Sequence, residues 1–243
     1  MHEQSQNAPF VTTCWSVVLA AAGSDTTAAQ DALSHLCKTY WYPLYAFVRR
    51  RGFSPHDAQD LTQEFFSKLL KGHWVAQADR RRGRFRSFLL SAMKHFLANE
   101  WHKANAIKRG AHLDLISMDD HDAEARFQLE PGTQVNSDAL YDRGWALTLL
   151  RDVLARLEQE YSAEGKAAWM ETMRPALTAG RDAISYSEMA CKLNTSENAL
   201  RVAVHRLRQR YRQLIRVEVA STVASPEEVD EEMRYLFEVL AGT

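Results

Sequence analysis

The sequence predicts an all-α protein made of two small helical domains joined by an acidic linker. The 243 residues include only 10 Gly and 6 Pro, too few turn-forming residues for a many-stranded sandwich. Apolar residues recur at helical spacing along most of the chain. No run of about 18 apolar residues occurs and the N-terminus lacks a basic flank before an apolar stretch, so neither a membrane span nor a secretory signal is predicted.

The predicted organisation has five parts along the chain. Changes in periodicity, in charge and in turn-forming residues define their boundaries. We expect an N-terminal segment over residues 1–25, a helical domain over 26–110, an acidic linker over 111–142, a second helical domain over 143–219 and an acidic C-terminal helix over 220–243.

The first domain begins with two predicted helices. The first spans residues 26–51, where Pro43 predicts a kink or a new start after Tyr42, because proline lacks a backbone donor. Ser54 and Pro55 suit the cap and the first position of the second helix.

The second helix carries two stripes of different character. Leu61, Phe65 and Leu69 are spaced at i, i+4 and i+8, which predicts a core-facing stripe. The other stripe is polar and mainly acidic, and it offers a surface for a partner. Its members are Asp57, Asp60, Gln63 and Glu64.

A basic loop over residues 79–84, which includes Arg80 and Arg84, leads into a long helix over residues 85–108. The apolar repeat of this helix is the clearest in the chain, and it favours Phe85, Phe88 and Phe96 as core residues over base-stacking ones. For Trp101 both roles are open. The opposite face is basic and suits nucleic acid phosphates. Its members are Arg86, Lys94, Asn99, Lys103 and Lys108.

Charge is segregated along the chain although the net charge is only −1. Residues 38–110 hold 15 basic and 5 acidic residues, and residues 201–217 hold 6 basic and none acidic. The linker has 1 basic and 8 acidic residues, and residues 218–243 have 1 and 7. Two basic blocks predict two surfaces that contact a polyanion, with solvated helix faces as the alternative.

The chain gives no pattern of a metal or disulfide site. In the linker, the side chains from His112 to Asp122 have no fixed helical spacing, so a solvated segment is favoured over a metal site. Three widely spaced cysteines and no CxxC pair favour a reducing, cytoplasmic location over a disulfide framework.

The second domain contains a predicted helix-turn-helix. An amphipathic helix through Trp145 and Leu157 and a second one ending near Pro175 precede it. Ser185 has capping-box spacing, Asn194 occupies the tight turn, and a further helix follows to about residue 219. The first residues of that last helix, 196–205, are expected to reach base edges, and Arg206, Arg210 and Arg212 are expected to contact phosphates.

An apolar stripe on the acidic C-terminal segment predicts one more helix. We expect this helix to dock on the second domain or on a partner and to modulate activity, or simply to extend the packing of the second domain. The stripe contains Val229, Met233, Leu236, Phe237 and Leu240.

Three segments together resemble those of bacterial RNA polymerase sigma factors of the sigma-70 family, extracytoplasmic-function (ECF) type. Residues 57–66 (DAQDLTQEFF) resemble the family's core-polymerase-binding helix, and residues 85–100 (FRSFLLSAMKHFLANE) resemble its −10 element helix. Residues 186–208 resemble its −35 helix-turn-helix, with Asn194 in place of the common glycine. The resemblance covers about residues 26–219.

The resemblance implies a protein that binds core RNA polymerase and directs it to promoter DNA, without a cofactor, a metal or catalytic residues. It implies that the acidic linker lies in the RNA path of the polymerase. Both DNA contacts would act only in the complex, so the free protein is expected to bind DNA weakly and in a salt-sensitive way. An anti-sigma factor or other regulatory partner is left open.

The implied site residues fall into three groups. Core-polymerase binding is expected at Asp57, Asp60, Leu61, Gln63, Glu64 and Phe65. Contacts to the −10 element are expected at Arg80, Arg84, Phe85, Arg86, Lys94, Asn99, Trp101 and Lys103. Contacts to the −35 element are expected at Ser196, Glu197, Asn198, Arg201, Val202, His205, Arg206 and Arg208.

Other interpretations remain open at this point. A helix-turn-helix regulator that acts without polymerase would have no use for the acidic stripe, and a helical adaptor would leave the basic blocks incidental. An enzyme using the nine histidines lacks HExxH, GxSxG and a Gly-rich phosphate loop. The sigma-factor interpretation would be excluded by Arg201 and His205 in a core, or by a sealed acidic stripe.

Overall fold

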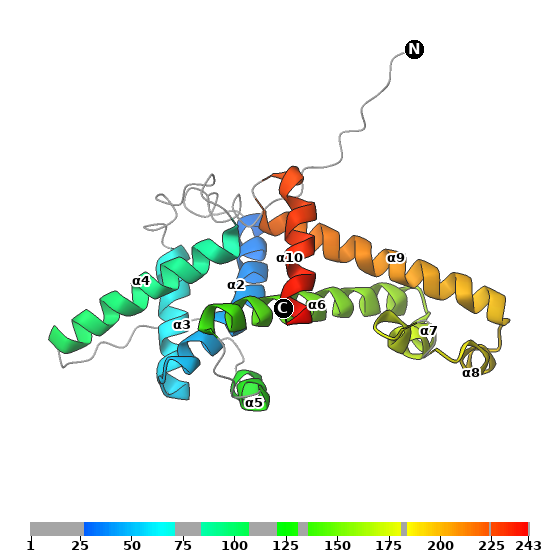
Figure 1. The fold of residues 1–243 in the computed structure, drawn as a ribbon, viewed down its shortest axis with the longest axis horizontal. Helices are drawn as coiled ribbons and strands as arrows, with labels where there is room; N and C mark the ends of the chain where they lie inside the picture. Colours follow the sequence, from blue (N-terminus) through cyan, green and yellow to red (C-terminus); the bar gives the residue numbers. More distant parts are fainter. Residues whose placement is uncertain are drawn as a thin grey trace, which may run out of the picture. The chain divides into compact units, whose positions relative to one another are not determined.

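A computed structural model describes residues 27–70, 84–106, 121–130, 136–180, 184–223 and 225–242 of the chain. Every regular element in these ranges is a helix, which confirms the predicted all-α class (Figure 1). Contacts between residues divide the chain into two compact units. The first unit contains the residues up to Thr148 together with those from Val219 onward, and the second contains Leu149–Glu218.

The first unit is built around three helices, α2 (Thr27–Arg50), α3 (Pro55–Leu70) and α4 (Phe85–Ala106), each of which contacts the other two. Aromatic side chains fill the space between them. The ring of Tyr40 meets Phe85 edge-on at 5.5 Å between centroids, and Phe65 lies 5.9 Å from Phe96. The predicted core roles of Phe85 and Phe96 are confirmed, since both side chains are buried.

Helix α2 continues through Pro43, so the expected new start after Tyr42 is wrong. Buried side chains precede and follow the proline, and helix α6 (Ser137–Ala163) passes close to it. A Cβ atom on Gly144 of α6 would lie 3.7 Å from the Cα of Pro43. The packing on both sides of Pro43 offsets the missing backbone hydrogen bond.

The predicted linker contains a helix, α5 (His121–Leu129), which packs against α2. Helix α6 then begins at Ser137, and its first residues belong to the first unit, with Tyr141 and Trp145 fully buried. Residues 121–130 therefore form part of a packed domain, which corrects the prediction of a solvated segment. The remaining linker residues before position 121 and over 131–135 lie outside the described residues.

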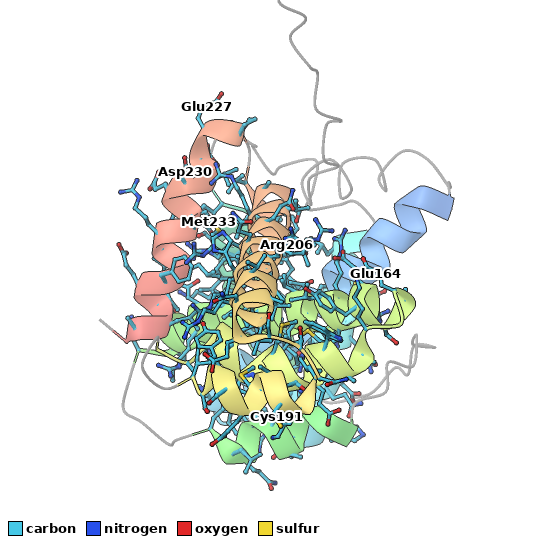
Figure 2. All side chains as sticks on the ribbon, turned by 90° about the vertical axis from the view of Figure 1, so that its right-hand side faces the viewer. Glu164, Cys191, Arg206, Glu227, Asp230 and Met233 are labelled. Carbon is cyan, nitrogen blue, oxygen red and sulfur yellow. The ribbon has the colours of Figure 1, made fainter. Side chains whose placement is uncertain are left out.

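The C-terminal segment also belongs to the first unit. A 3₁₀ turn (Pro226–Glu228) leads into α10 (Val229–Ala241), and Figure 2 shows Glu227, Asp230 and Met233 along this segment. This placement corrects the expectation that the helix extends the second domain. It also changes the predicted stripe, since Phe237 is 53% exposed whereas Val229, Glu232 and Leu236 are buried.

The second unit contains the end of α6, α7 (Ala167–Met173), a 3₁₀ turn (Arg174–Leu177), α8 (Tyr186–Lys192) and most of α9 (Glu197–Thr222). Its core is made by Leu149, Leu157, Met173, Leu200 and Leu207, at the helical spacings that the sequence predicts. One of its ion pairs links α9 to α6. Arg210 of α9 forms a bidentate pair with Glu160 of α6 at 2.7 and 2.8 Å.

Candidate functional site

The acidic stripe on α3 is accessible, as the sequence predicts. Ser54 caps the helix by accepting a hydrogen bond from the backbone N–H of Asp57 at 3.1 Å, and its hydroxyl donates to the Asp57 carboxylate at 2.7 Å. Asp57 and Asp60 are exposed, and Glu64 is partly exposed beside Lys68, 2.6 Å from its Nζ. The stripe therefore presents carboxylates to solvent on one face of a helix that is fixed at its N-terminus.

The apolar neighbours of the stripe are divided between surface and core. Leu61 and Gln63 are partly exposed, so both remain able to contact a partner. Phe65 is fully buried and lies edge-on to Phe66 at 5.7 Å between ring centroids. This placement corrects the prediction for Phe65, which supports the stripe from inside rather than presenting a surface.

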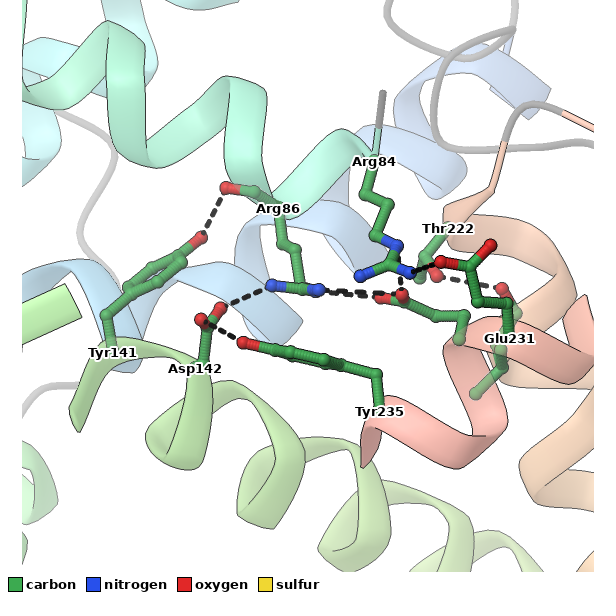
Figure 3. Close-up of polar contacts among 9 residues, drawn as sticks. Arg84, Arg86, Tyr141, Asp142, Thr222, Glu231 and Tyr235 are labelled. Atoms are coloured by element: carbon green, nitrogen blue, oxygen red, sulfur yellow. Dashed lines mark hydrogen bonds and ion pairs between the residues drawn. The ribbon is translucent and has the colours of Figure 1, made fainter. Parts of the chain in front are cut away.

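The start of α4 lies against α10, from the opposite end of the chain (Figure 3). The Arg84 guanidinium donates to Glu231 through Nη2 at 2.7 Å and lies 2.6 Å from Glu232 through Nε. Arg86 donates to the other carboxylate oxygen of Glu232 through Nε, also at 2.7 Å. Arg84 and Arg86, two of the arginines predicted to contact the −10 element, are therefore paired with carboxylates of the C-terminal helix.

A buried polar network surrounds Arg86 in Figure 3. Its Nη1 donates to Asp142 at 2.6 Å, and the Tyr235 hydroxyl donates to the second oxygen of Asp142 at 2.6 Å. The Tyr235 ring lies 4.0 Å from the guanidinium carbon, a cation–π contact. Burial alone would lower the pKa of Arg86, but Glu232, Asp142 and Tyr235 outweigh it and the pKa is raised.

These contacts correct the predicted −10 contacts at two positions. Arg86 is only 3% exposed and Phe85 is fully buried, so neither side chain presents itself to solvent. Arg86 directly follows the core residue Phe85. Its side chain therefore points towards α6 and α10 and not towards the exposed side of α4. Arg84 keeps about a quarter of its side chain exposed.

The rest of the predicted basic face is partly described. Lys94 donates to Asp138 of α6 at 2.5 Å and is partly exposed, while Asn99 is exposed. Trp101 and Lys103 lie on α4, but their side chains are outside the described residues, as is the whole of Arg80. Of the basic residues predicted on this face, those with a described side chain are engaged with carboxylates, namely Arg84, Arg86 and Lys94.

Helix α5 neutralises the arginines at the C-terminus of α2. Glu124 accepts hydrogen bonds from Nε and Nη2 of Arg49, each at 2.9 Å, and from the Tyr45 hydroxyl at 2.5 Å. Glu130 pairs with Arg50 and accepts from Tyr42. Hydrogen bonding to Arg49, aided by Tyr45, holds the pKa of Glu124 down at about 2.

The helix-turn-helix forms at the predicted place in the second unit. Asn194 adopts φ 48°, the left-handed conformation that asparagine tolerates best after glycine. The N–H of Thr195 bonds to the Ala190 carbonyl at 3.0 Å, and that of Asn194 bonds to Cys191 at 3.2 Å. This pair of bonds is a Schellman motif, which ends α8 and turns the chain towards α9.

Ser196 caps α9 by accepting a hydrogen bond from the backbone N–H of Ala199 at 3.2 Å. Ser185 makes no such bond at the start of α8, so the predicted capping box there is wrong and the helix begins without one. The cap fixes the N-terminus of α9, and the first turns of the helix carry mainly exposed side chains.

The predicted −35 residues are exposed along the first half of α9, with one exception. Arg201 stacks on the Tyr186 ring of α8 at 4.3 Å and remains mostly exposed, and Arg206 is also exposed. Arg208 instead donates to the carbonyls of Ala176 and Ala179 at 2.9 and 3.1 Å and anchors the helix. The exposed members are Ser196, Glu197, Asn198, Arg201, Val202, His205 and Arg206.

Three residues of the buried network were not predicted from the sequence, namely Asp142, Glu232 and Tyr235. Glu232 offers the clearest signal, because it lies three residues after Val229 and four before Leu236, in the middle of an apolar stripe. A carboxylate at such a position needs a buried cationic partner. Nothing in the local sequence identifies that partner as Arg86, which is 146 residues away.

The described ranges lack two kinds of feature, a membrane-spanning helix and a cluster of metal ligands. No helix there has the length and the apolar content that a bilayer crossing needs. Nor do three or more His, Cys, Asp or Glu side chains of those ranges gather as metal ligands.

Comparison with protein-family models gives one match. The family described as sigma-70 region 2 matches residues 36–107, which comprise most of α2 and all of α3 and α4. The searches of curated proteins and of solved structures gave no significant match. The match confirms the resemblance to the sigma-70 family over these residues, whereas the ECF type stays a prediction.

Proposed function

We propose that this protein is a sigma factor that binds core RNA polymerase and directs it to promoters, because residues 36–107 match the family described as sigma-70 region 2. The family match carries the proposal. The helix-turn-helix of the second unit supports it, since a second DNA-reading module is what a promoter with two elements requires.

Polymerase binding is assigned to the exposed stripe of α3. Asp57 and Asp60 offer exposed carboxylates at helical spacing, with Leu61 and Gln63 partly exposed beside them. Carboxylates bordered by apolar surface suit a basic helical partner, because charge complementarity orients the encounter and apolar contact adds affinity. The structure seals none of these groups.

Reading of the −35 element is assigned to α9. Its capped N-terminus presents Asn198, Arg201 and His205 at the spacing of successive turns, which suits base edges in a major groove. Arg206 suits a phosphate. The helical domain that includes α4 would hold the −10 strand, with Asn99 and the loop before α4 as the nearest candidates.

Reconstitution with core polymerase and run-off transcription from genomic fragments tests the proposal. Promoter-specific transcripts that appear only when the protein is added are the expected result. A double variant with Asp57→Arg and Asp60→Arg should abolish co-purification with core polymerase. Glu171→Arg, at an exposed position of α7 in the second unit, is a single charge reversal elsewhere on the surface that should leave co-purification intact.

The same variants distinguish a sigma factor from a regulator that acts without polymerase. If the α3 variant binds and transcribes like the wild type, or if no fragment gives a transcript with core polymerase, the sigma-factor proposal is overturned.

A further inference from the structure

The C-terminal helix contacts the arginine at the end of the predicted basic loop before α4. Arg84 is the last residue of the segment 79–84 and directly precedes α4. The two donors on one edge of its guanidinium are taken by carboxylates, Nη2 by Glu231 at 2.7 Å and Nε by Glu232 at 2.6 Å. The Tyr235 ring covers it at 5.1 Å.

These three contacts leave little of the guanidinium for another anion. A phosphate binds arginine through the same paired N–H groups that a carboxylate uses. A phosphate therefore cannot take a bidentate position on the Nε and Nη2 edge of Arg84 until at least one α10 carboxylate has withdrawn.

The two carboxylates differ in how easily they withdraw. Glu232 is fully buried and also pairs with Arg86, so removing it would leave a charge without a partner in the interior. The side chain of Glu231 is 64% exposed and contacts Arg84 from the solvent side. An exposed pair of this kind is weak and is screened by salt, so its rupture is inexpensive.

We propose that α10 is an autoinhibitory element in which Glu231 holds Arg84 in place of a DNA phosphate, with Glu232 and Tyr235 anchoring the helix. This inference rests on the proposed function of the α4 region. The contact keeps the free protein from binding single-stranded DNA through this arginine, and a competing strand in the polymerase complex displaces Glu231 alone.

Binding of a fluorescent single-stranded oligonucleotide by the full-length protein tests the inference. Glu231→Gln removes the exposed charge, so affinity should rise about two- to fivefold, the scale of one partly exposed ion pair. The dependence of log K on log salt should steepen by about 0.7, the value for one additional phosphate on a single strand.

Glu227→Gln is the matched control. It makes the same change in net charge on the same segment, at an exposed position whose carboxylate interacts with Ser225 and which extends outward at the end of the segment in Figure 2. An equal gain in affinity from both variants would show a general charge effect and would overturn the inference.

A double variant identifies the arginine. Arg84→Ala should cancel the gain of Glu231→Gln and should weaken that variant more than it weakens the wild type, because only the freed guanidinium contacts DNA. Equal losses in the two backgrounds would show that Arg84 is not masked.

These outcomes are independent of transcription with core polymerase. If run-off transcription succeeds and the Glu231→Gln gain is absent, the autoinhibitory contact is refuted and the sigma-factor function stands. If core polymerase does not respond, the proposed function fails whatever the oligonucleotide shows.

Discussion

Arg86 of α4 and Arg206 of α9 both belong to the basic blocks of the sequence, yet their surroundings differ completely. Arg86 is buried between Asp142 and Glu232, whereas Arg206 faces solvent. The same contrast extends along the two blocks. In the first unit, Arg49, Lys94 and Arg84 pair with carboxylates supplied by the predicted linker and tail.

The second block keeps more of its charge at the surface. Arg210 pairs with Glu160 and Arg208 bonds to backbone carbonyls, while His205 and Arg206 remain exposed on the first half of α9. A positive run in a sequence therefore does not by itself define a positive surface. Only α9 offers the unobstructed cationic face that the charge pattern predicts for both, within the described part of the chain.

The largest effect is expected from Glu232→Ala. This change leaves the buried Arg86 with one of its two carboxylates, so the free energy of unfolding should fall by about 3–5 kcal/mol. Urea denaturation followed by circular dichroism measures it. Glu227→Ala should change stability by less than about 0.5 kcal/mol, and a comparable loss from both variants would show that the network is not specific.

A smaller, pH-dependent effect is expected from Glu124→Gln. The folded pKa of Glu124 is about 2, below its ordinary value of 4.5, so its ion pair stabilises the fold fully above pH 4.5 and is lost as the pH falls towards 2. The variant should lose about 1–2 kcal/mol at pH 7, after discounting for partial exposure. Urea denaturation at several pH values should show the two proteins converging below pH 4, and a constant difference would contradict this assignment.

The smallest effect is expected from Arg206→Ala on α9. Loss of one phosphate contact should weaken binding of the polymerase complex to a duplex promoter fragment about fivefold and lower its salt slope by about 0.9. Fluorescence anisotropy over a salt series measures both values. Arg156→Ala, an exposed arginine of α6 near Glu160, should change neither of them. Equal effects of the two substitutions would show that α9 contributes no more to DNA binding than the rest of the second unit does.

Features governed by neighbouring residues could be predicted from the sequence. The cap at Ser54, the left-handed turn at Asn194 and the core stripe through Phe85 and Phe96 depend on short spacings that a sequence displays directly. The exposed positions of α9 followed from the same periodicity.

Features governed by distant partners could not be predicted from the sequence. Helix α5 has only nine residues and weak periodicity, and the pairs of its Glu124 and of the following Glu130 with Arg49 and Arg50 form across more than 70 positions. The continuation of α2 through Pro43 likewise depends on packing from both sides. The sequence predicts Arg86 as a surface residue, because its carboxylate partners lie far along the chain on α6 and α10 and leave no signal near position 86.

The position of α10 in the chain determines when the first unit can be completed during synthesis. The first unit begins with α2 but receives Glu232 and Tyr235 only from the last helix of the chain. While the ribosome is still producing the second unit, Arg86 has no Glu232 to pair with, and the N-terminal helices are held without the contacts that α10 supplies. The first unit is therefore begun before the second unit and completed after it. A truncation that removes α10 weakens the first unit, because it removes Glu232 and Tyr235.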